Sequence, residues 1–573
     1  MINKFLLTIF IFVFFPLSLY SQWSSDPNIN LNICDTTGEQ ALVKIATTQD
    51  GGCYISWFDS RAGSYAVYLQ RLNSSGIKQF SGNGLLISNN SQSSSLVDYD
   101  LAVDDSNCAV IAFTDTRNGT SINPFTYRIS PAGQFLWGAN GITLTDSSAV
   151  YQPNPRIILT SDGNYIIVWQ YGNKIAMQKI TKTGAKPWGN IPLMIIGNPS
   201  ISEKFNFPIG IKSDNGNFIL YWMGYTGSFL NPQNYKIYTQ KYSPAGATLW
   251  SATQDTIYNL GGGSGTYQPT LYPDGSNGAI YVWQDLRTGN WGSYVQRKNS
   301  AGQILFPVNG SAVAVSSTIM LRLAPVAAYM PLTQETYVFW QQKNSLQSVI
   351  GVYGQKFSSN GTRIWNDTGV AFKPLDQNSF SSLITIVRDT NVLVFYDEIL
   401  FGSVNCYIKA FRTDRNGTFG WGGSIITPSS ILSEKIRLNT AINNSGMSML
   451  AWEDRRLDGG IYAQNINFNG SYGNPTGIIN NNKILPVNYE LYQNYPNPFN
   501  PVTIISYSLP VNSFVKIKIY DNLGREIYSL VNTLQNAGKY EIKFDGTNLS
   551  SGIYFYKLNS GMFSDVKTMV LIK

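Results

Sequence analysis

Eight apolar runs, each ending in an aromatic residue, recur through most of this 573-residue chain. The closing aromatics are Trp57, Phe113, Trp169, Trp222, Trp283, Trp340, Phe395 and Trp452. They are spaced by 56, 56, 53, 61, 57, 55 and 57 residues, which is too regular for chance. A repeat of this length predicts one structural unit per copy, with neighbouring copies stacked to bury a continuous core.

Each copy has the same anatomy. A Gly-, Asp- or Asn-rich turn precedes the apolar run, and an alternating segment such as Tyr68–Arg71 follows it, so that a hairpin is predicted. A turn glycine comes next, and in seven copies an aromatic residue stands four positions later. These aromatics are Phe80, Trp137, Trp188, Trp250, Phe306, Trp365 and Trp421. We therefore expect four strands per repeat.

The eighth copy has Asn474 where this aromatic is expected, and the missing piece lies at the other end of the chain. The segment WSSDPNINLNIC, residues 23–34, is similar to WGANGITLTD, residues 137–146. A first strand that completes the last sheet would close a ring without leaving a bare edge. We predict an all-β fold, with an eight-bladed β-propeller over residues 22–475. Two four-bladed rings are the alternative, and the single closing strand argues against them. The repeats resemble β-propeller-like repeats of type IX-exported surface proteins and match neither WD40 nor kelch signatures.

Composition agrees with an all-β protein and excludes several chemistries. Charged residues make up 13% of the chain, whereas glycine (51) and tyrosine (35) are abundant. The net charge of +7 forms no basic run, so we expect no nucleic-acid partner. The chain has no histidine, which excludes Ser-His-Asp and Cys-His nucleophiles. The four cysteines form no C-x-x-C pair and no EF-hand spacing is present, so we expect neither a metal nor a cofactor.

The N-terminal residues predict export. A lysine at position 4 precedes an apolar stretch of about 16 residues, which is short for a spanning helix at about 20. We expect residues 1–21 to be a cleaved signal peptide. No other segment is long and apolar enough to span a bilayer, so we expect no transmembrane segment in the mature chain.

An Asp-x-Arg triplet follows the closing aromatic in four repeats. The pairs are Asp59 and Arg61, Asp115 and Arg117, Asp285 and Arg287, and Asp454 and Arg456, while a fifth repeat keeps only Asp397. A feature shared by many repeats usually serves the scaffold, which favours a structural role. The alternative is a polar rim that binds a glycan or a protein loop. Trp291 and Tyr65, in the same loops, are candidate aromatic contacts, and Trp291 has no counterpart in other copies.

In a chain without histidine, carboxylates are the best candidates for catalytic groups. A glycosidase needs two of them about 5–10 Å apart. The segment DYDLAVDD holds Asp98, Asp100, Asp104 and Asp105, and WEDRR holds Glu453 and Asp454. We interpret the segment DYDLAVDD more simply as a loop and an inner strand with solvated ends. We name no catalytic residue.

The end of the chain predicts a second domain. Residues 476–486 are rich in Asn, Gly and Pro and predict a linker. Residues 487–573 alternate in short segments, which predicts a small β-sandwich. The prolines after Asn494 cannot join a helix and predict a stiff, extended connector.

This tail resembles the type A C-terminal sorting domain of the type IX secretion system. The resemblance rests on an ordered set of motif residues: Asn494, Pro496, Asn497, Pro498, Phe499, Asn500, Pro501, Gly524 and Gly552, with a closing VLIK at 570–573. It implies that residues 487–573 bind the secretion machinery. It also implies that the chain passes through the periplasm to the outer cell surface or the medium.

Taken together, these features predict an exported surface or secreted binding protein whose ligand is a glycan or a surface protein. One alternative is a histidine-free carbohydrate-active enzyme with paired carboxylates. Another is a structural surface or adhesion component.

Overall fold

The computed structural model describes residues 22–92, 97–119, 121–145, 149–456, 459–474, 489–511, 513–535, 538–560 and 563–573. The predicted signal peptide (1–21) and linker (476–486) lie outside these ranges. The chain divides into two compact units, residues 1–475 and 476–573. Within the described ranges both units are built from strands, and the helical segments are three 3₁₀ turns, η1 (Pro199–Ile201), η2 (Asp214–Gly216) and η3 (Trp421–Gly423). The all-β prediction is confirmed.

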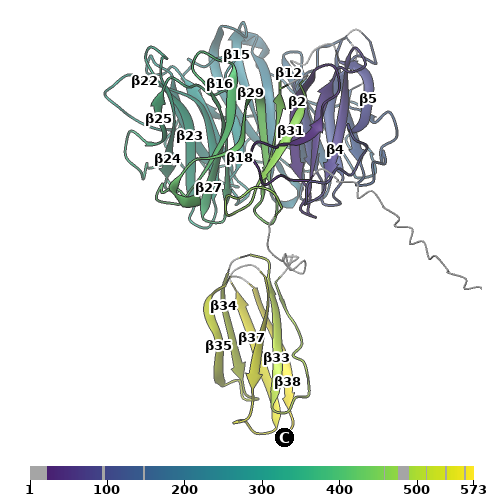
Figure 1. The fold of residues 1–573 in the computed structure, drawn as a ribbon, viewed down its shortest axis with the longest axis vertical. Coiled ribbons are helices and arrows are strands. Elements are labelled where there is room, and N and C mark those ends of the chain that lie inside the picture. Colours follow the sequence, from purple (N-terminus) through teal and green to yellow (C-terminus); the bar gives the residue numbers. More distant parts are fainter. Residues whose placement is uncertain are drawn as a thin grey trace, which may run out of the picture. The chain divides into compact units, whose positions relative to one another are not determined.

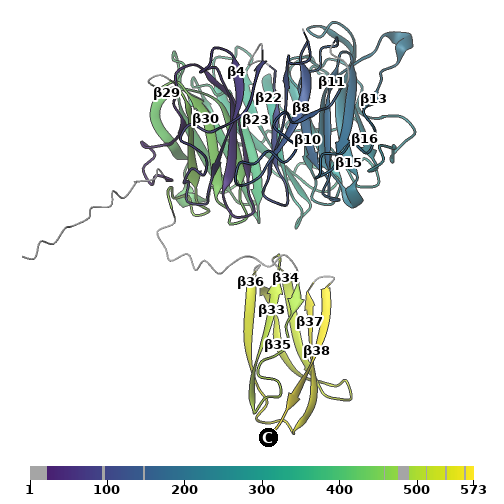
Figure 2. The same cartoon turned by 90° about the vertical axis from the view of Figure 1, so that its right-hand side faces the viewer.

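The first unit contains six four-stranded antiparallel sheets, each made of strands consecutive in sequence (Figures 1 and 2). Sheet 1 comprises β2 (Gln40–Thr47), β3 (Cys53–Asp59), β4 (Tyr65–Leu72) and β5 (Leu85–Gln92). Sheet 2 comprises β6 (Asp100–Val103), β7 (Ala109–Asp115), β8 (Asn123–Ile129) and β9 (Ile142–Thr143). Sheet 3 comprises β10 (Arg156–Leu159), β11 (Tyr165–Tyr171), β12 (Lys174–Ile180) and β13 (Leu193–Ile195).

The next three sheets repeat this plan. Sheet 4 comprises β14 (Lys204–Lys212), β15 (Phe218–Gly227), β16 (Pro232–Tyr242) and β17 (Asp255–Tyr258). Sheet 5 comprises β18 (Thr270–Pro273), β19 (Ala279–Asp285), β20 (Gly292–Lys298) and β21 (Ser311–Ala312). Sheet 6 comprises β22 (Met320–Met330), β23 (Glu335–Asn344), β24 (Ile350–Phe357) and β25 (Val370–Asp376).

The last two repeats are joined in one seven-stranded sheet of order β1-β31-β30-β29-β28-β27-β26. Its strands are β1 (Leu31–Cys34), β26 (Leu383–Arg388), β27 (Asn391–Ile399), β28 (Asn405–Thr413), β29 (Ile426–Ile442), β30 (Ser448–Asp454) and β31 (Ile461–Ile466). The 17-residue strand β29 pairs with β28 through its first half and with β30 through its second half. The sequence does not predict this fusion, because the repeat pattern implies a break between the two sets.

The second strand of each repeat is the predicted apolar run, and it is buried on both faces. Strands β3, β7, β19 and β30 are buried at every position. The aromatics that close these runs include Trp57, Trp169, Trp222, Trp283, Trp340 and Trp452, which are among the largest fully buried side chains. Both faces are covered because adjacent sheets pack face to face, with one hydrophobic cluster between them.

Consecutive sheets also touch through their first strands. Strand β2 contacts β6, β6 contacts β10, and the series continues through β14, β18, β22 and β26 to β29. Strand β29 in turn contacts β2. The side chain of Asn443 donates to the carbonyl of Gly51 at 2.9 Å, and Thr47 Oγ1 donates to the carbonyl of Ile442 at 3.2 Å. The last repeat therefore lies against the first.

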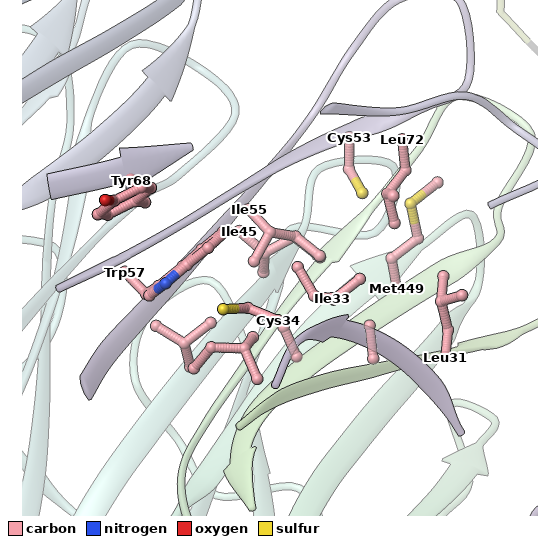
Figure 3. Packing of buried hydrophobic residues seen from close by; sticks show 14 of the residues in the cluster. Leu31, Ile33, Cys34, Ile45, Cys53, Ile55, Trp57, Tyr68, Leu72 and Met449 are labelled. Carbon is pink, nitrogen blue, oxygen red and sulfur yellow. The ribbon is translucent and has the colours of Figure 1, made fainter. Parts of the chain in front are cut away.

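The N-terminal strand completes the last sheet, as the sequence predicts. Strand β1 pairs antiparallel with β31, with Leu31 opposite Ala463 and Asn32 opposite Tyr462. Figure 3 shows Ile33 and Cys34 of β1 among Ile45, Ile55 and Trp57 of sheet 1, with Met449 of β30 beside them. Residues from the two ends of this unit thus share one core cluster.

In four repeats the tryptophan past the turn glycine links a sheet to the next one by a hydrogen bond. The indole Nε1 atoms of Trp137, Trp188, Trp250 and Trp421 donate to backbone carbonyls in the following repeat: those of Lys182, Pro244, Ser300 and Phe468. Trp23 Nε1 donates in the same way to the carbonyl of Ser74, at 3.2 Å. Trp23 therefore takes the place of the aromatic residue that the eighth copy lacks, because that copy has Asn474 at this position.

The second unit consists of two sheets around one core (Figure 1). One sheet has the order β32-β33-β36 and the other β35-β34-β37-β38. The strands are β32 (Glu490–Leu491), β33 (Val502–Leu509), β34 (Ser513–Tyr520), β35 (Glu526–Gln535), β36 (Gly538–Asp545), β37 (Gly552–Ser560) and β38 (Phe563–Leu571).

Candidate binding end and C-terminal domain

The loops between second and third strands lie beside the connections that lead from one repeat to the next. Ser60 N donates to the carbonyl of Glu39 at 2.9 Å, and Leu286 N donates to that of Gly262 at 3.0 Å. The backbone of Ile399 exchanges two such bonds with Ser379. We call the ends of the sheets that carry these segments the loop end. The predicted site residues of the first unit all lie there.

The aspartates of the Asp-x-Arg triplets are buried and already bonded within the protein. Asp59, Asp115 and Asp285 have no exposed surface, and Asp454 has 1%. In Asp285, Oδ2 accepts from Trp283 Nε1 at 2.8 Å and from Arg287 Nη2 at 2.7 Å, while Oδ1 accepts from Arg287 N at 3.0 Å. Asp59 and Asp454 bind the indole of Trp57 or Trp452 and the arginine two residues later in the same way. Asp115 follows Phe113, whose ring has no N–H group to donate, and binds Arg117.

Each arginine of these triplets also lies over an aromatic ring of the third strand. The guanidinium carbon of Arg61 lies 4.0 Å from the centre of the Tyr68 ring, and that of Arg117 lies 3.8 Å from the centre of the Phe125 ring. The corresponding distances are 3.6 Å from Arg287 to Tyr294 and 4.1 Å from Arg456 to Tyr462. Three of them donate to the carbonyl of an asparagine that precedes the fourth strand: Asn83, Asn140 or Asn309. One side chain thus joins three strands of its sheet.

Hydrogen bonds shift the pKa of the Asp59 carboxyl. Burial alone would raise the pKa of Asp59, but the bonds from Arg61 and Trp57 hold it below its ordinary value. Asp397 has no arginine partner, and burial raises its pKa even though it accepts from the backbone N–H groups of Ser381 and Ser382. The carboxyl pKa is thus lowered in Asp59, which has an arginine partner, and raised in Asp397, which has none.

Trp291 lies at the loop end, next to a residue that the sequence analysis did not single out. Its ring meets the ring of Tyr267 edge to face, with centroids 5.5 Å apart. Trp291 is half-buried and Tyr267 is 46% exposed. Both lie outside the core cluster of sheets 4 and 5. Tyr267 sits in the glycine-rich connection after sheet 4, so no motif marks it. Tyr65, the other candidate aromatic, is half-buried and donates to Glu39 Oε2.

A cavity of about 290 Å³ opens where the first and last repeats meet. Its lining includes Glu39, Glu453 and Asp454. Burial raises the pKa of the Glu453 carboxyl, and the negative charge of Glu39 adds to this effect. Glu453 Oε1 nevertheless accepts from Leu42 N at 2.6 Å, and both oxygens accept from Arg437 Nη1 at 3.0 Å. Glu39 was missed because the two acids come from distant parts of the chain.

In the acidic segment DYDLAVDD, Asp98, Asp104 and Asp105 each pair with a basic side chain. Asp98 bridges Lys44 and Arg156, at 2.7 and 2.6 Å. Asp104 is buried and binds Arg128 at 2.7 Å, which corrects the expectation of a solvated end, and Asp105 binds Lys182. Across the described ranges, no group of three or more Cys, Asp or Glu side chains is placed to hold a metal ion.

In the second unit, the proline-rich segment is part of the folded domain. Asn494 and Phe499 are buried, and Asn494 Nδ2 donates to Thr503 Oγ1 at 2.9 Å. Phe499 N donates to the carbonyl of Val570 at 2.9 Å, and Ile572 N donates to the carbonyl of Phe499 at 3.0 Å. The segment is thus not the stiff connector that the sequence predicts, because buried Phe499 and its backbone hydrogen bonds hold it against the last strand.

The other motif residues of this unit lie at its surface or in its turns. Pro496, Pro498 and Asn500 are exposed, and Asn497 and Pro501 are half-buried. Gly524 turns the chain between β34 and β35 with φ of 76°, and Gly552 begins β37.

A family model described as "Secretion system C-terminal sorting domain" matches residues 493–573. These residues are the C-terminal sorting domain of the type IX secretion system. The sorting domain implies an interaction with the secretion machinery and export to the cell surface or the medium. Within the part of the chain that the structure describes, no helix has the length and apolarity needed to span a membrane.

Comparison with other proteins assigns no activity to the first unit. No curated protein sequence matches the chain. A puromycin hydrolase structure is 11% identical with a TM-score of 0.40, and the match covers 76% of this chain and 61% of that one. The polysaccharide lyase Uly1 is 11% identical with a TM-score of 0.37, covering 70% and 92%. PorZ, a surface component of the type IX system of Porphyromonas gingivalis, is 12% identical with a TM-score of 0.28, covering 94% and 82%. TM-scores this low assign neither a fold nor an activity.

Proposed function

We propose that residues 22–475 form a closed eight-bladed β-propeller and act as the cargo of the sorting domain. The series of first-strand contacts from β2 round to β29 and back to β2 supports this architecture. So do the pairing of β1 with β31 and the hydrogen bond from Asn443 to Gly51. In this proposal residues 1–21 are the signal peptide, residues 476–486 the linker and residues 487–573 a small sandwich that the secretion machinery recognises.

We further propose that the exported protein is a binding module that captures its ligand, a glycan or a surface protein, at the loop end. The edge-to-face pair of Trp291 and Tyr267 carries this proposal. Two aromatic rings outside the core, one of them 46% exposed, offer a rigid apolar platform, and such rings dominate recognition surfaces. A sugar ring presents C–H groups that pack on a platform of this kind.

In the same proposal the Asp-x-Arg triplets serve the scaffold. Their carboxylates have at most 1% exposed surface, and the protein already bonds their oxygens. A ligand that used them would have to displace a buried ion pair, which costs several kcal/mol (~3 or more). The triplets hold the loops that carry Trp291 rather than contacting the ligand.

Replacing Trp291 by alanine tests the binding module. We expect Trp291→Ala to lower affinity at least tenfold for the glycans retained by the full chain on a glycan array, because the platform is lost. Leu346→Ala is the matched control, because Leu346 is 83% exposed in another loop at the same end. Equal retention by wild type and Trp291→Ala would refute this assignment of the platform.

A second candidate function is carbohydrate cleavage at the cavity of Glu39 and Glu453. The observation that favours it is a cavity that holds Glu453, whose pKa burial raises, beside the second carboxylate Glu39, because glycoside hydrolysis uses two carboxyl groups. We expect Glu453→Gln to abolish any glycan cleavage by the full chain, with Asp367→Asn as the exposed-carboxylate control. Undiminished cleavage in Glu453→Gln would exclude this site.

A further inference from the structure

Arg322 is one of two arginines of the described ranges that form no ion pair with a carboxylate, and it lacks the aromatic contacts of the other, Arg412. Apart from Arg322 and Arg412, every arginine of the described ranges forms an ion pair with a carboxylate. Arg412 lies over the rings of Phe468 and Trp421 and donates to the carbonyl of Phe468 at 2.9 Å. The guanidinium of Arg322 has one weak bond, from Nη1 to the carbonyl of Met320 at 3.5 Å.

The environment of Arg322 makes this isolation costly. Its Nε atom is buried and has no hydrogen-bond partner. Burial lowers the pKa of the guanidinium below its ordinary value, and the weak opposing influence comes from Tyr294, not from a carboxylate. Arg322 is half-buried, so its charge is only partly hydrated, and a perturbed unpaired charge of this kind is a candidate for a ligand-binding role.

Arg322 is held beside the aromatic platform. Its backbone N–H donates to the carbonyl of Trp291 at 2.9 Å, and its carbonyl accepts from Ser293 Oγ at 2.9 Å. It lies near the loop end of β22, the first strand of sheet 6, while Trp291 immediately precedes β20 of sheet 5. The ring of Tyr294, whose hydroxyl lies near Arg322, is fixed by Arg287 stacked over it.

We propose that Arg322 and the Trp291–Tyr267 platform form one site for an acidic sugar, with Arg322 binding the carboxylate of a uronic acid. A guanidinium offers paired N–H donors that match the two oxygens of a carboxylate. The neighbouring rings bind the face of the sugar, which favours a carbohydrate over an acidic peptide. This inference rests on the proposed binding function and names the class of its ligand.

The test uses the purified full chain and trimers of galacturonate, glucuronate and mannuronate. The methyl ester of each trimer is its neutral counterpart. We expect at least one acid trimer to bind more tightly than its ester. Arg322→Gln should weaken binding of that acid at least tenfold and leave the ester unchanged, because only the charge-assisted bonds are lost. Arg412→Gln is the matched control, since it removes the other arginine without an ion pair.

The contrary outcomes distinguish a failure of the role of Arg322 from a failure of the proposed binding function. If acid and ester bind equally and only Trp291→Ala weakens both, the platform stands and the role of Arg322 is refuted. If a poly-glutamate peptide displaces the trimers as well as they displace each other, the site is not one for sugars. If no acid trimer binds, the inference is refuted, while the glycan array still decides whether the platform binds neutral sugars. Melting temperatures of both glutamine variants within about 2 °C of wild type show that any loss is local.

Discussion

Replacing Asp59 by alanine should lower the free energy of unfolding by about 3–5 kcal/mol. The change leaves three donors without their acceptor: the indole of Trp57, the backbone N–H of Arg61 and the guanidinium of Arg61. Trp57 is fully buried, so its indole N–H finds no water. Urea unfolding followed by tryptophan fluorescence measures the loss. Asp367→Ala is the control, because Asp367 is 70% exposed, and its ion pair with Arg363 should contribute under about 1 kcal/mol.

The same aspartate predicts how stability depends on pH. The pKa of Asp59 in the folded protein lies below its ordinary value of about 3.9. A group with a depressed folded pKa stabilises the protein above its unfolded pKa, and this contribution is lost as pH falls through the folded pKa. Wild type and Asp59→Ala should therefore differ fully at pH 6, and the difference should shrink progressively below about pH 4. A difference that stays constant down to pH 3 would contradict the assigned ion pair.

A chain that begins at residue 36 lacks β1, and we expect it to be less stable than the full chain and to self-associate. The deletion exposes the edge of β31 and uncovers a core cluster in which Leu31, Ile33 and Cys34 are at most 2% exposed. Burying three such side chains contributes about 1.5–3 kcal/mol each, so we expect a loss of roughly 5–9 kcal/mol. The free edge should also promote self-association, which light scattering after size-exclusion chromatography detects.

Adding the missing strand as a peptide distinguishes a lost strand from general misfolding. A synthetic peptide of residues 22–35 should restore the monomer and the thermal transition of the shortened chain, because β1 pairs only with β31. The same peptide with Ile33 replaced by aspartate should not, since Ile33 is fully buried. A shortened chain that remains monomeric with an unchanged transition would show that β1 does not close the unit.

The parts of the fold that local pattern controls could be predicted from the sequence. The apolar run before Trp57 or Trp283 must be a strand covered on both faces, and the repeat spacing places its neighbours. The likeness of Trp23 to Trp137 was enough to predict the pairing of β1. The fusion through β29 was not predictable, because no residue marks where one strand continues into the next set. The segment after Asn494 was predicted to be a connector because of its prolines. The burial of Phe499 depends on tertiary contacts, which the local sequence does not show.

The candidate site was predicted less well, for a related reason. Trp291 stood out because it breaks the repeat, whereas Tyr267 lies in an irregular connection with no periodicity to break. Arg322 resembles any arginine in sequence. What sets it apart is that, within the described ranges, it has neither an ion pair nor the aromatic contacts of Arg412, and such an absence emerges only when the sheets are assembled. The same holds for Glu39 and Glu453, which meet across more than four hundred residues.

The pairing of β1 with β31 also governs the order of events during folding. Residues 31–34 are made early, yet their partners at 461–463 are made more than four hundred residues later. Contacts of such sequence separation form slowly, and an open strand edge is prone to aggregation while it waits. The first strand of this unit therefore remains unpaired until β31 has been made, so a product truncated before residue 461 is left with an open strand edge.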